Sequence, residues 1–238
     1  MTSTPDRFEE FWEASSLDRF RLAEFARTLN AYDADDKELH LEYPDGPSPL
    51  PRPRTRLGAL SRRRRSGRAF TATDLNARDL GVLLGGLRAW DGLEHRGYPS
   101  AGATYVTETF VVGFHAQGLT GKVAYYDAEA HGLVVVSEKA PTWDEADPTI
   151  NAGVTGTPSV LVVVVVFPER VTAKYGERGG RFALLEAGAA MQQLSLAVAG
   201  ARNLKGVVVG GMLDDAWLRI LGLSETDARI VVGYLVGR

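Results

Sequence analysis

The chain has 238 residues, a net charge of −3 and no cysteine. This length suits one domain, or one domain with an extension, and allows roughly 70% of the unfolded surface to be buried. The lack of cysteine excludes disulfides, thiolate metal sites, iron–sulfur clusters and a cysteine nucleophile. The four histidines are widely scattered, and the sequence contains no zinc, P-loop or serine-hydrolase motif, so we expect no metal site.

The N-terminal residues do not predict a targeting signal. Residues 1–12 are polar and acidic, without the apolar run of a signal peptide. The longest apolar run, at 160–167, is far shorter than the ~20 residues that a membrane helix needs. We therefore expect a cytoplasmic, soluble protein.

The first quarter of the chain predicts a helical extension and a connector. Apolar residues recur at helical spacing over residues 7–29, and the serines at 15–16 occupy an N-cap position. Residues 30–53 are rich in Asp and Pro, which predicts an extended surface segment. We place an N-terminal extension at 1–53 and the main domain at 54–238.

The main domain predicts an α+β fold. Leucines at helical spacing predict a helix up to Trp90, with Thr73 and Asp74 as capping candidates. The segment 159–167 is apolar on both faces, as in a central strand. The helix expected at 182–201 is rich in small residues and should be deeply packed. Strands are also expected at 104–113, 122–127, 133–137, 207–209 and 230–236, and a helix at 215–221. Because this order lacks regular βαβ alternation, it favours α+β over a doubly wound sheet.

Four short segments carry the candidate chemistry, and the first is basic. Eight arginines and no acidic residue lie between residues 52 and 68. Such a block binds phosphate, an acidic partner or water. In the run Arg64-Arg65-Ser66-Gly67-Arg68, guanidinium and hydroxyl groups can converge on one phosphate. Taken alone, this segment favours a solvated basic face or a nucleic-acid-binding arm.

The other three segments are also weak when taken singly. The run Pro99-Ser100-Ala101-Gly102-Ala103 is a turn of small residues that would let a flat ring approach the backbone. The third of the four segments is Lys174-Tyr175-Gly176-Glu177-Arg178, with Arg181 soon after. The fourth is Val209-Gly210-Gly211-Met212, whose glycines can present a backbone N–H to a ligand.

Together these segments resemble the nitroreductase-like flavoproteins, specifically the streptolysin-associated (SagB-type) dehydrogenases, also called azoline oxidases. The resemblance rests on R-R-S-x-R-x-F, P-S-A-G-A, K-Y-G-x-R and Q-x-L-x-L-A in this order, and it covers about residues 40–238. It implies a nitroreductase-like fold with a mostly antiparallel central sheet flanked by helices. It also implies an entwined homodimer with FMN at the subunit interface.

The resemblance also assigns roles by position. Arg64, Arg65, Ser66 and Arg68 would hold the FMN phosphate and ribityl chain, with Arg238 as a second phosphate ligand. Pro99, Ser100, Ala101, Gly102 and Ala103 would pack on the flavin ring, from the partner subunit. Gly210, followed by Gly211, would point its N–H toward flavin N5, and Gln192 would lie on the central dimer helix. Lys174 and Tyr175 would be the catalytic acid–base pair.

The implied activity is the oxidation of thiazoline or oxazoline rings to thiazoles or oxazoles in a ribosomally made peptide. A separate cyclodehydratase would make the azoline. Gly67, Ala189 and Gln193 depart from the family pattern, which weakens inferences about the substrate pocket. Two alternatives stay open: a generic FMN-dependent NAD(P)H reductase of nitro compounds or quinones, and a non-catalytic nucleic-acid-binding or scaffold protein.

Overall fold

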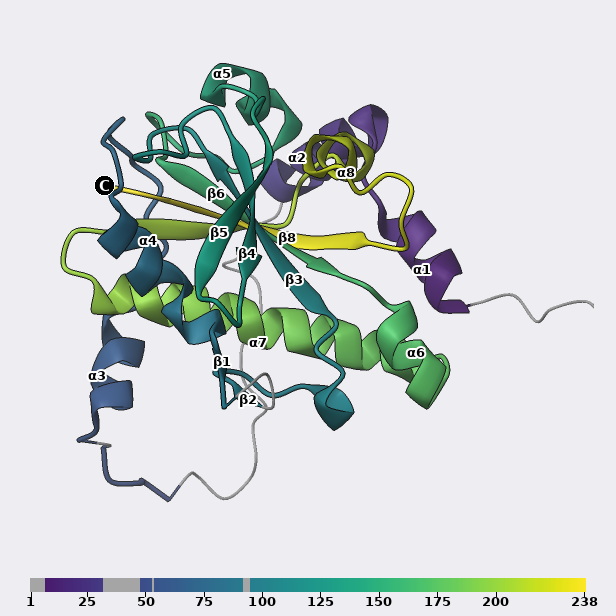
Figure 1. Ribbon diagram of the computed structural model, residues 1–238, viewed down its shortest axis with the longest axis horizontal. Helices are drawn as coiled ribbons and strands as arrows, with labels where there is room; N and C mark the ends of the chain where they lie inside the picture. The colour runs from purple at the N-terminus through teal and green to yellow at the C-terminus, as the bar shows by residue number, and fades with distance from the viewer. Residues whose placement is uncertain (1–6, 32–47, 53, 92–94) are drawn as a thin grey trace, which may run out of the picture.

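The computed structural model describes residues 7–31, 48–52, 54–91 and 95–238. A six-stranded antiparallel sheet, in the order β5-β4-β3-β6-β8-β7, is covered by helices on both faces (Figure 1). The predicted α+β fold is therefore confirmed. The strands of this sheet are β3 (Thr107–Gly113), β4 (Val123–Asp127), β5 (Gly132–Ser137), β6 (Val160–Val166), β7 (Lys205–Val209) and β8 (Arg229–Gly237).

The helices fall into three groups. The first two helices precede the main domain. The third, fourth, sixth and seventh lie on one face of the sheet, and the fifth and eighth lie on the other. The helices are α1 (Arg7–Ser15), α2 (Arg19–Ala31), α3 (Arg56–Arg63), α4 (Ala77–Leu84), α5 (Trp143–Ala146), α6 (Glu169–Tyr175), α7 (Arg178–Gly200) and α8 (Asp214–Leu221). A two-stranded sheet of β1 (Ala89–Trp90) and β2 (His95–Arg96) and three 3-10 turns complete the described elements.

Strand β6 is the centre of the molecule. Its seven aliphatic residues are fully buried, and it pairs with β3 on one side and β8 on the other. Successive side chains of a strand point to opposite faces. Val160, Val162, Val164 and Val166 therefore join the core beneath α7, and the three residues between them join the core beneath α5 and α8.

Helix α7 lies along one face of the sheet (Figure 1). Its inner face contains Ala183, Ala187 and Ala190, all fully buried, so the helix axis comes close to the strands. By length and composition alone α7 could cross a membrane, but a core helix meets the same criteria, and α7 is a core helix here. The prediction of a deeply packed small-residue helix is confirmed, with the start four residues earlier.

The two ends of α7 carry different partners. Helix α6 packs at its N-terminal end, where a methyl group on Gly179 would lie 2.8 Å from the Val171 backbone. Helix α3 packs at its C-terminal end, where Leu60 lies against Gly200. Figure 1 shows α3 and α6 at opposite ends of the long helix. Lys174 and Tyr175, on α6, and the basic segment that follows α3 therefore lie at opposite ends of α7.

Both predicted helix caps are wrong. The hydroxyls of Ser15 and Ser16 donate to the carbonyl of Trp12 and so finish α1, whereas the Asp18 carboxylate accepts the first N–H groups of α2. Asn76, and not Thr73 or Asp74, caps α4 by a reciprocal pair of hydrogen bonds with Asp79. In both cases the cap is a later Asx residue, which satisfies the same orphan N–H groups. Most of the predicted connector (residues 32–47 and 53) lies outside the described residues.

Two glycines of α7 provide a matched test of this packing. Gly179→Ala should lower the free energy of unfolding by about 1–3 kcal/mol, because its methyl group would overlap the Val171 backbone. Gly188→Ala should raise it by about 0.5–1 kcal/mol, because that position is open and Ala favours a helix. Urea denaturation measures both. Equal effects would contradict the contact between α6 and α7.

Candidate functional site

The basic segment docks on the first residues of β7. The Gly67 N–H donates to the Gly206 carbonyl at 2.9 Å, and the Thr155 N–H donates to the Arg68 carbonyl at 2.8 Å. Lys205 Nζ donates to the Ala69 carbonyl at 3.2 Å. These bonds fix the backbone of this segment at this end of the sheet. None of Arg64, Arg65 and Arg68 forms an ion pair with any residue that the structure describes.

The arginines of this segment point in different directions. Arg64 is half-buried near Tyr234. Burial raises the pKa of Tyr234, while a hydrogen bond with Ser195 and the positive charge of Arg64 oppose that rise. Arg65 is exposed and borders a cavity of about 520 Å³ with other cations. These cations are Arg62, Arg63, Arg202 and Lys205.

Arg238 reaches the same end of the sheet from β8. Gly237 pairs with Lys205, and the Arg238 carbonyl accepts from the Thr71 N–H at 2.7 Å. The Arg238 guanidinium, however, lies 2.7 Å from the Asp79 carboxylate. In this structure Arg238 is therefore ion-paired with that acid.

The paired glycines stand at the other end of β7. Strand β7 has five residues, so Lys205 and Val209 lie about 13 Å apart. A methyl group on Gly210 would meet no atom within 4 Å, so the space beside this backbone is open. The Gly211 carbonyl accepts from the Asn151 N–H at 2.7 Å, which holds the turn. A group of cations and an exposed backbone therefore lie at the two ends of one edge strand.

Lys174 and Tyr175 come together at the opposite end of α7. They lie in the last turn of α6, which ends at Gly176 with φ 57°. Lys174 Nζ donates to the Gly102 carbonyl at 3.3 Å and lies 5.5 Å from the centre of the Tyr175 ring. Any side chain on residue 102 would overlap both Lys174 Nζ and Tyr175 Oη. Glycine at 102 therefore allows both groups to converge on this loop.

The loop that receives them has an unusual backbone. Gly102, Ala103 and Tyr105 have φ values of 58°, 54° and 41°. Left-handed φ is costly for residues other than glycine and persists where neighbours enforce it. Ser100 helps, because its Oγ accepts from the Tyr105 N–H at 2.9 Å. The turn also explains why the strand predicted from residue 104 starts at Thr107.

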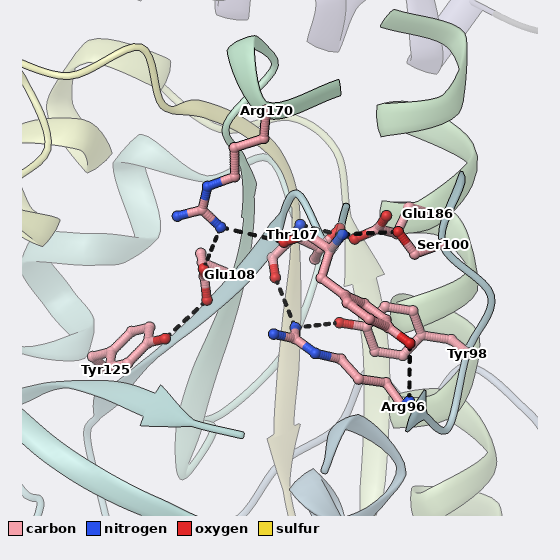
Figure 2. A network of polar contacts seen from close by, with 9 residues as sticks. Arg96, Tyr98, Ser100, Thr107, Glu108, Tyr125, Arg170 and Glu186 are labelled. Carbon is pink, nitrogen blue, oxygen red and sulfur yellow. Dashed lines mark hydrogen bonds and ion pairs between the residues drawn. The ribbon is translucent and has the colours of Figure 1, made fainter. Parts of the chain in front are cut away.

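A buried polar network holds this loop against the sheet (Figure 2). Arg96 donates to the Tyr98 hydroxyl at 2.9 Å and to the Thr107 carbonyl at 3.2 Å. Its guanidinium also lies 4.7 Å from the centre of the Tyr105 ring. Glu186, almost fully buried on α7, accepts from the Thr107 N–H at 2.9 Å. Arg96 and Glu186 thus fix both ends of the segment that contains Pro99–Ala103.

The same network reaches α6. Glu108 accepts from Arg170 at 2.6 Å and from the Tyr125 hydroxyl at 2.9 Å. Arg170 is one turn before Lys174, so this ion pair orients the helix that carries the candidate catalytic pair. None of these supporting residues was predicted from the sequence. Glu186 bonds across 79 positions and Arg170 across 62, and no local motif marks the shorter contacts of Arg96.

The two glutamines of α7 behave differently. Gln192 is exposed on the helix surface away from the sheet. Gln193 donates from its side-chain nitrogen to the Gly97 carbonyl and packs beside Gly86. Gln193 therefore supports the start of the Pro99 loop, although the sequence pattern singled it out only as a departure.

The predicted residues therefore form two groups. Gly210 and the basic segment follow β7, whereas Lys174 and Tyr175 meet the Pro99–Ala103 loop at the far end of α7. Helix α7 has 23 residues, about 34 Å at 1.5 Å per residue. The basic segment and the Lys174–Tyr175 pair therefore lie at opposite ends of α7, whereas Gly210 shares a cavity with Leu184 in the N-terminal half of that helix.

The sequence profile of the nitroreductase family matches residues 61–238. The chain belongs to the nitroreductase family. A nitroreductase-family protein of Methanocaldococcus jannaschii is 29% identical over 166 residues, which are 68% of this chain and 82% of that protein.

Two solved structures extend the comparison. A chain of the Escherichia coli microcin synthetase McbBCD complex, with truncated pro-MccB17 bound, has a TM-score of 0.70 at 23% identity. The match covers 94% of this chain and 83% of that one. A nitroreductase of Ralstonia eutropha has a TM-score of 0.62 at 23% identity, covering 83% and 87%. Both likenesses show that this chain has the nitroreductase fold.

The residues of this nitroreductase-family chain fit a flavin nucleotide. Unpaired cations next to Lys205 suit a phosphate, and the open backbone at Gly210 suits a flat ring.

The buried tyrosine of the network predicts a response to alkaline pH. Burial raises the pKa of Tyr98 to about 12. Because the unfolded value is 10.0, the folded chain retains this proton longer. Its contribution to stability is present below pH 10 and is lost as pH rises to about 12, with a slope of at most about 1.4 kcal/mol per pH unit.

Tyr98→Phe should therefore flatten the alkaline loss of unfolding free energy. The pKa values of Tyr125 and Tyr126 are also raised to about 12, mainly by burial. These two residues would therefore retain part of the alkaline loss of stability in the variant. Urea denaturation across pH 9–12 measures the slope. Parallel declines in variant and wild type would show that Tyr98 is not the group responsible.

Proposed function

We propose that this protein is an FMN-dependent dehydrogenase that oxidises thiazoline or oxazoline rings of a peptide to thiazoles or oxazoles. The observation that carries the proposal is the convergence of Lys174 and Tyr175 on Gly102. A reductase that exchanges hydride with a nicotinamide needs no acid–base pair at this place. Aromatising an azoline does, because a proton must leave the carbon next to the one that loses hydride.

The residues divide the work as follows. FMN, when bound, supplies the hydride acceptor. Arg64, Ser66 and Arg68 would hold its phosphate and ribityl chain, and the Gly210 backbone would lie at its ring. Lys174 or Tyr175 would take the proton, so that the ring loses one hydride and one proton. Oxygen or another acceptor would then remove the two electrons.

The fold likeness supports a peptide substrate. The Escherichia coli chain belongs to a microcin synthetase complex with truncated pro-MccB17 bound. The likeness covers 94% of this chain, more than the part matched by the family profile, so it includes part of residues 1–60. We propose that this protein likewise acts on a modified peptide, and that a cyclodehydratase prepares its substrate.

A homodimer would complete the site. The basic segment and the catalytic pair lie at opposite ends of α7, and α7 exposes Leu185 and Gln192 on its outer face. A two-fold axis across this face would bring each chain's Pro99–Ala103 loop to the partner's cofactor.

The cofactor assignment makes a direct prediction. The purified protein should be yellow, with one non-covalent FMN per chain. Replacing Arg64 and Arg68 together by Ala should lower FMN occupancy at least about tenfold, because charge-assisted phosphate contacts are lost. The matched control replaces Arg52 and Arg56, which belong to the same block. Heat-released FAD, or a colourless protein after FMN reconstitution, would contradict the assignment.

The catalytic assignment predicts a separation of binding from turnover. Lys174→Ala and Tyr175→Phe should keep wild-type FMN occupancy, and at least one should lower azoline oxidation by about 10²-fold, as loss of a general base does. Lys139→Ala, an exposed lysine elsewhere, is the control. More than about a third of wild-type activity in both variants would exclude acid–base catalysis by this pair. Steady NADH oxidation by wild type would instead favour the generic reductase.

The same variants test the shared site. Mixing Lys174→Ala chains with chains that lack Arg64 and Arg68 should restore about a quarter of wild-type activity, because half of the dimers would hold one intact site. If each site belonged to one chain, the mixture would stay inactive. Refolding the variants together and separately provides the comparison.

A further inference from the structure

The N-terminal helices are seated on two glycines. The Phe8 ring of α1 packs over Gly180 of α7, where any side chain would overlap it. The Phe25 ring of α2 packs beside Gly211, where a methyl group would lie 2.9 Å from the ring. Both aromatic residues therefore occupy places that glycine keeps free. The extension is packed on the very turn that contains Gly210.

Polar contacts fix the same helices. The Leu17 N–H donates to Asp214 Oδ2 at 2.8 Å, and the Asp214 N–H donates back to the Leu17 carbonyl at 3.3 Å. Glu9 forms an ion pair with Arg229 at the start of β8. Burial raises the pKa of Asp214, and the bond from Leu17 opposes that rise. The helices are thus held in a defined position beside the β7–α8 turn.

Between the extension and α7 lie two adjoining cavities. One, of about 260 Å³, is lined by Trp12, Phe25 and Gly210 among others. The other, of about 400 Å³, is lined by Phe8 and by charged side chains, among others. Phe11 and Leu184 border both cavities. The charged residues are Arg7, Glu177 and Arg181.

The walls of these cavities have the character of a ligand site. They are mainly aromatic and aliphatic, with a few charges, as in sites of roughly 300–1,000 Å³ that bind small ligands. Phe11 is 54% exposed although it stands among other aromatic rings. Its free face is available to a ligand side chain, while Phe8 and Phe25 are used to seat the helices.

We infer that these cavities bind the apolar or aromatic side chain that flanks the azoline ring in the peptide substrate. The inference rests on the proposed function, because Gly210, the residue proposed to face the reacting part of the flavin, opens into the first cavity. A ring held at Gly210 leaves its neighbouring side chain within reach of Phe11 and Trp12. The charged side chains of both signs in the second cavity suit the amide groups of the peptide backbone.

The test uses peptides that bind without reacting. Two short synthetic peptides, each with one thiazole flanked by either Phe or Gly, are labelled with a fluorophore. Their dissociation constants are measured by fluorescence anisotropy on the FMN-loaded protein. The variant is Phe11→Ala, and the matched control is Phe20→Ala, an 87% exposed residue of α2 that lines neither cavity.

Wild type should bind the Phe-flanked peptide more tightly than the Gly-flanked one. Phe11→Ala should weaken the Phe-flanked peptide by about tenfold or more, as loss of an aromatic anchor does, and the Gly-flanked peptide by less than about twofold. Phe20→Ala should change neither. Equal weakening of both peptides by Phe11→Ala would overturn the inference.

Two further readouts separate this inference from others. If Phe11→Ala shifts dimer dissociation in sedimentation velocity but leaves both peptides unchanged, a second copy fills the cavities and the inference is wrong. Thiazoline versions of the same peptides report turnover. If the thiazoline peptides are oxidised but neither binding nor turnover depends on the flanking side chain, the inferred side-chain site is wrong and the proposed function stands. If binding depends on the side chain but no oxidation occurs, the side-chain site stands and the proposed function is wrong.

Discussion

The contact between α7 and the aliphatic strand β6 determines where every other part of the molecule lies. β6 is paired on both edges and buried on both faces, so its register fixes β3 and β8. The alanines of α7 bring that helix close to the alternate valines of β6. Close-packed interiors of this kind have little freedom to shift. The ends of α7 therefore act as two fixed points, one for the basic segment and one for α6.

Electrostatic contacts hold the loop at the second fixed point. Ala103 and Tyr105 adopt left-handed backbone angles, which cost of order 1 kcal/mol each. Arg96 and Glu186 offset this cost by bonding the segments on either side of the turn. The Glu108–Arg170 ion pair then connects the start of β3 to α6. The position of Lys174 is thus set by charged residues far from it in sequence.

Local sequence patterns predicted much of the fold, but they did not predict much of the candidate site. The Val-rich segments predicted the strands of the main sheet within a few residues. The caps at Asp18 and Asn76 were misplaced, because several capping residues stand close together in each segment. Helix α3 was not expected, since its residues were interpreted only as a basic block. The network around Arg96 joins segments that only folding brings together, and no local motif marks it.

Glycine at 180 and at 211 has a consequence for how such chains diverge. Each leaves room for one aromatic ring of the N-terminal helices, and neither is demanded by the backbone, since both have ordinary angles. The family profile begins after those helices, at residue 61. A relative that lacks the extension is free to place larger side chains at both positions. Phe8 with Gly180, and Phe25 with Gly211, should therefore be gained and lost as pairs. A genome survey could then recognise the extended branch from two small residues inside the common domain.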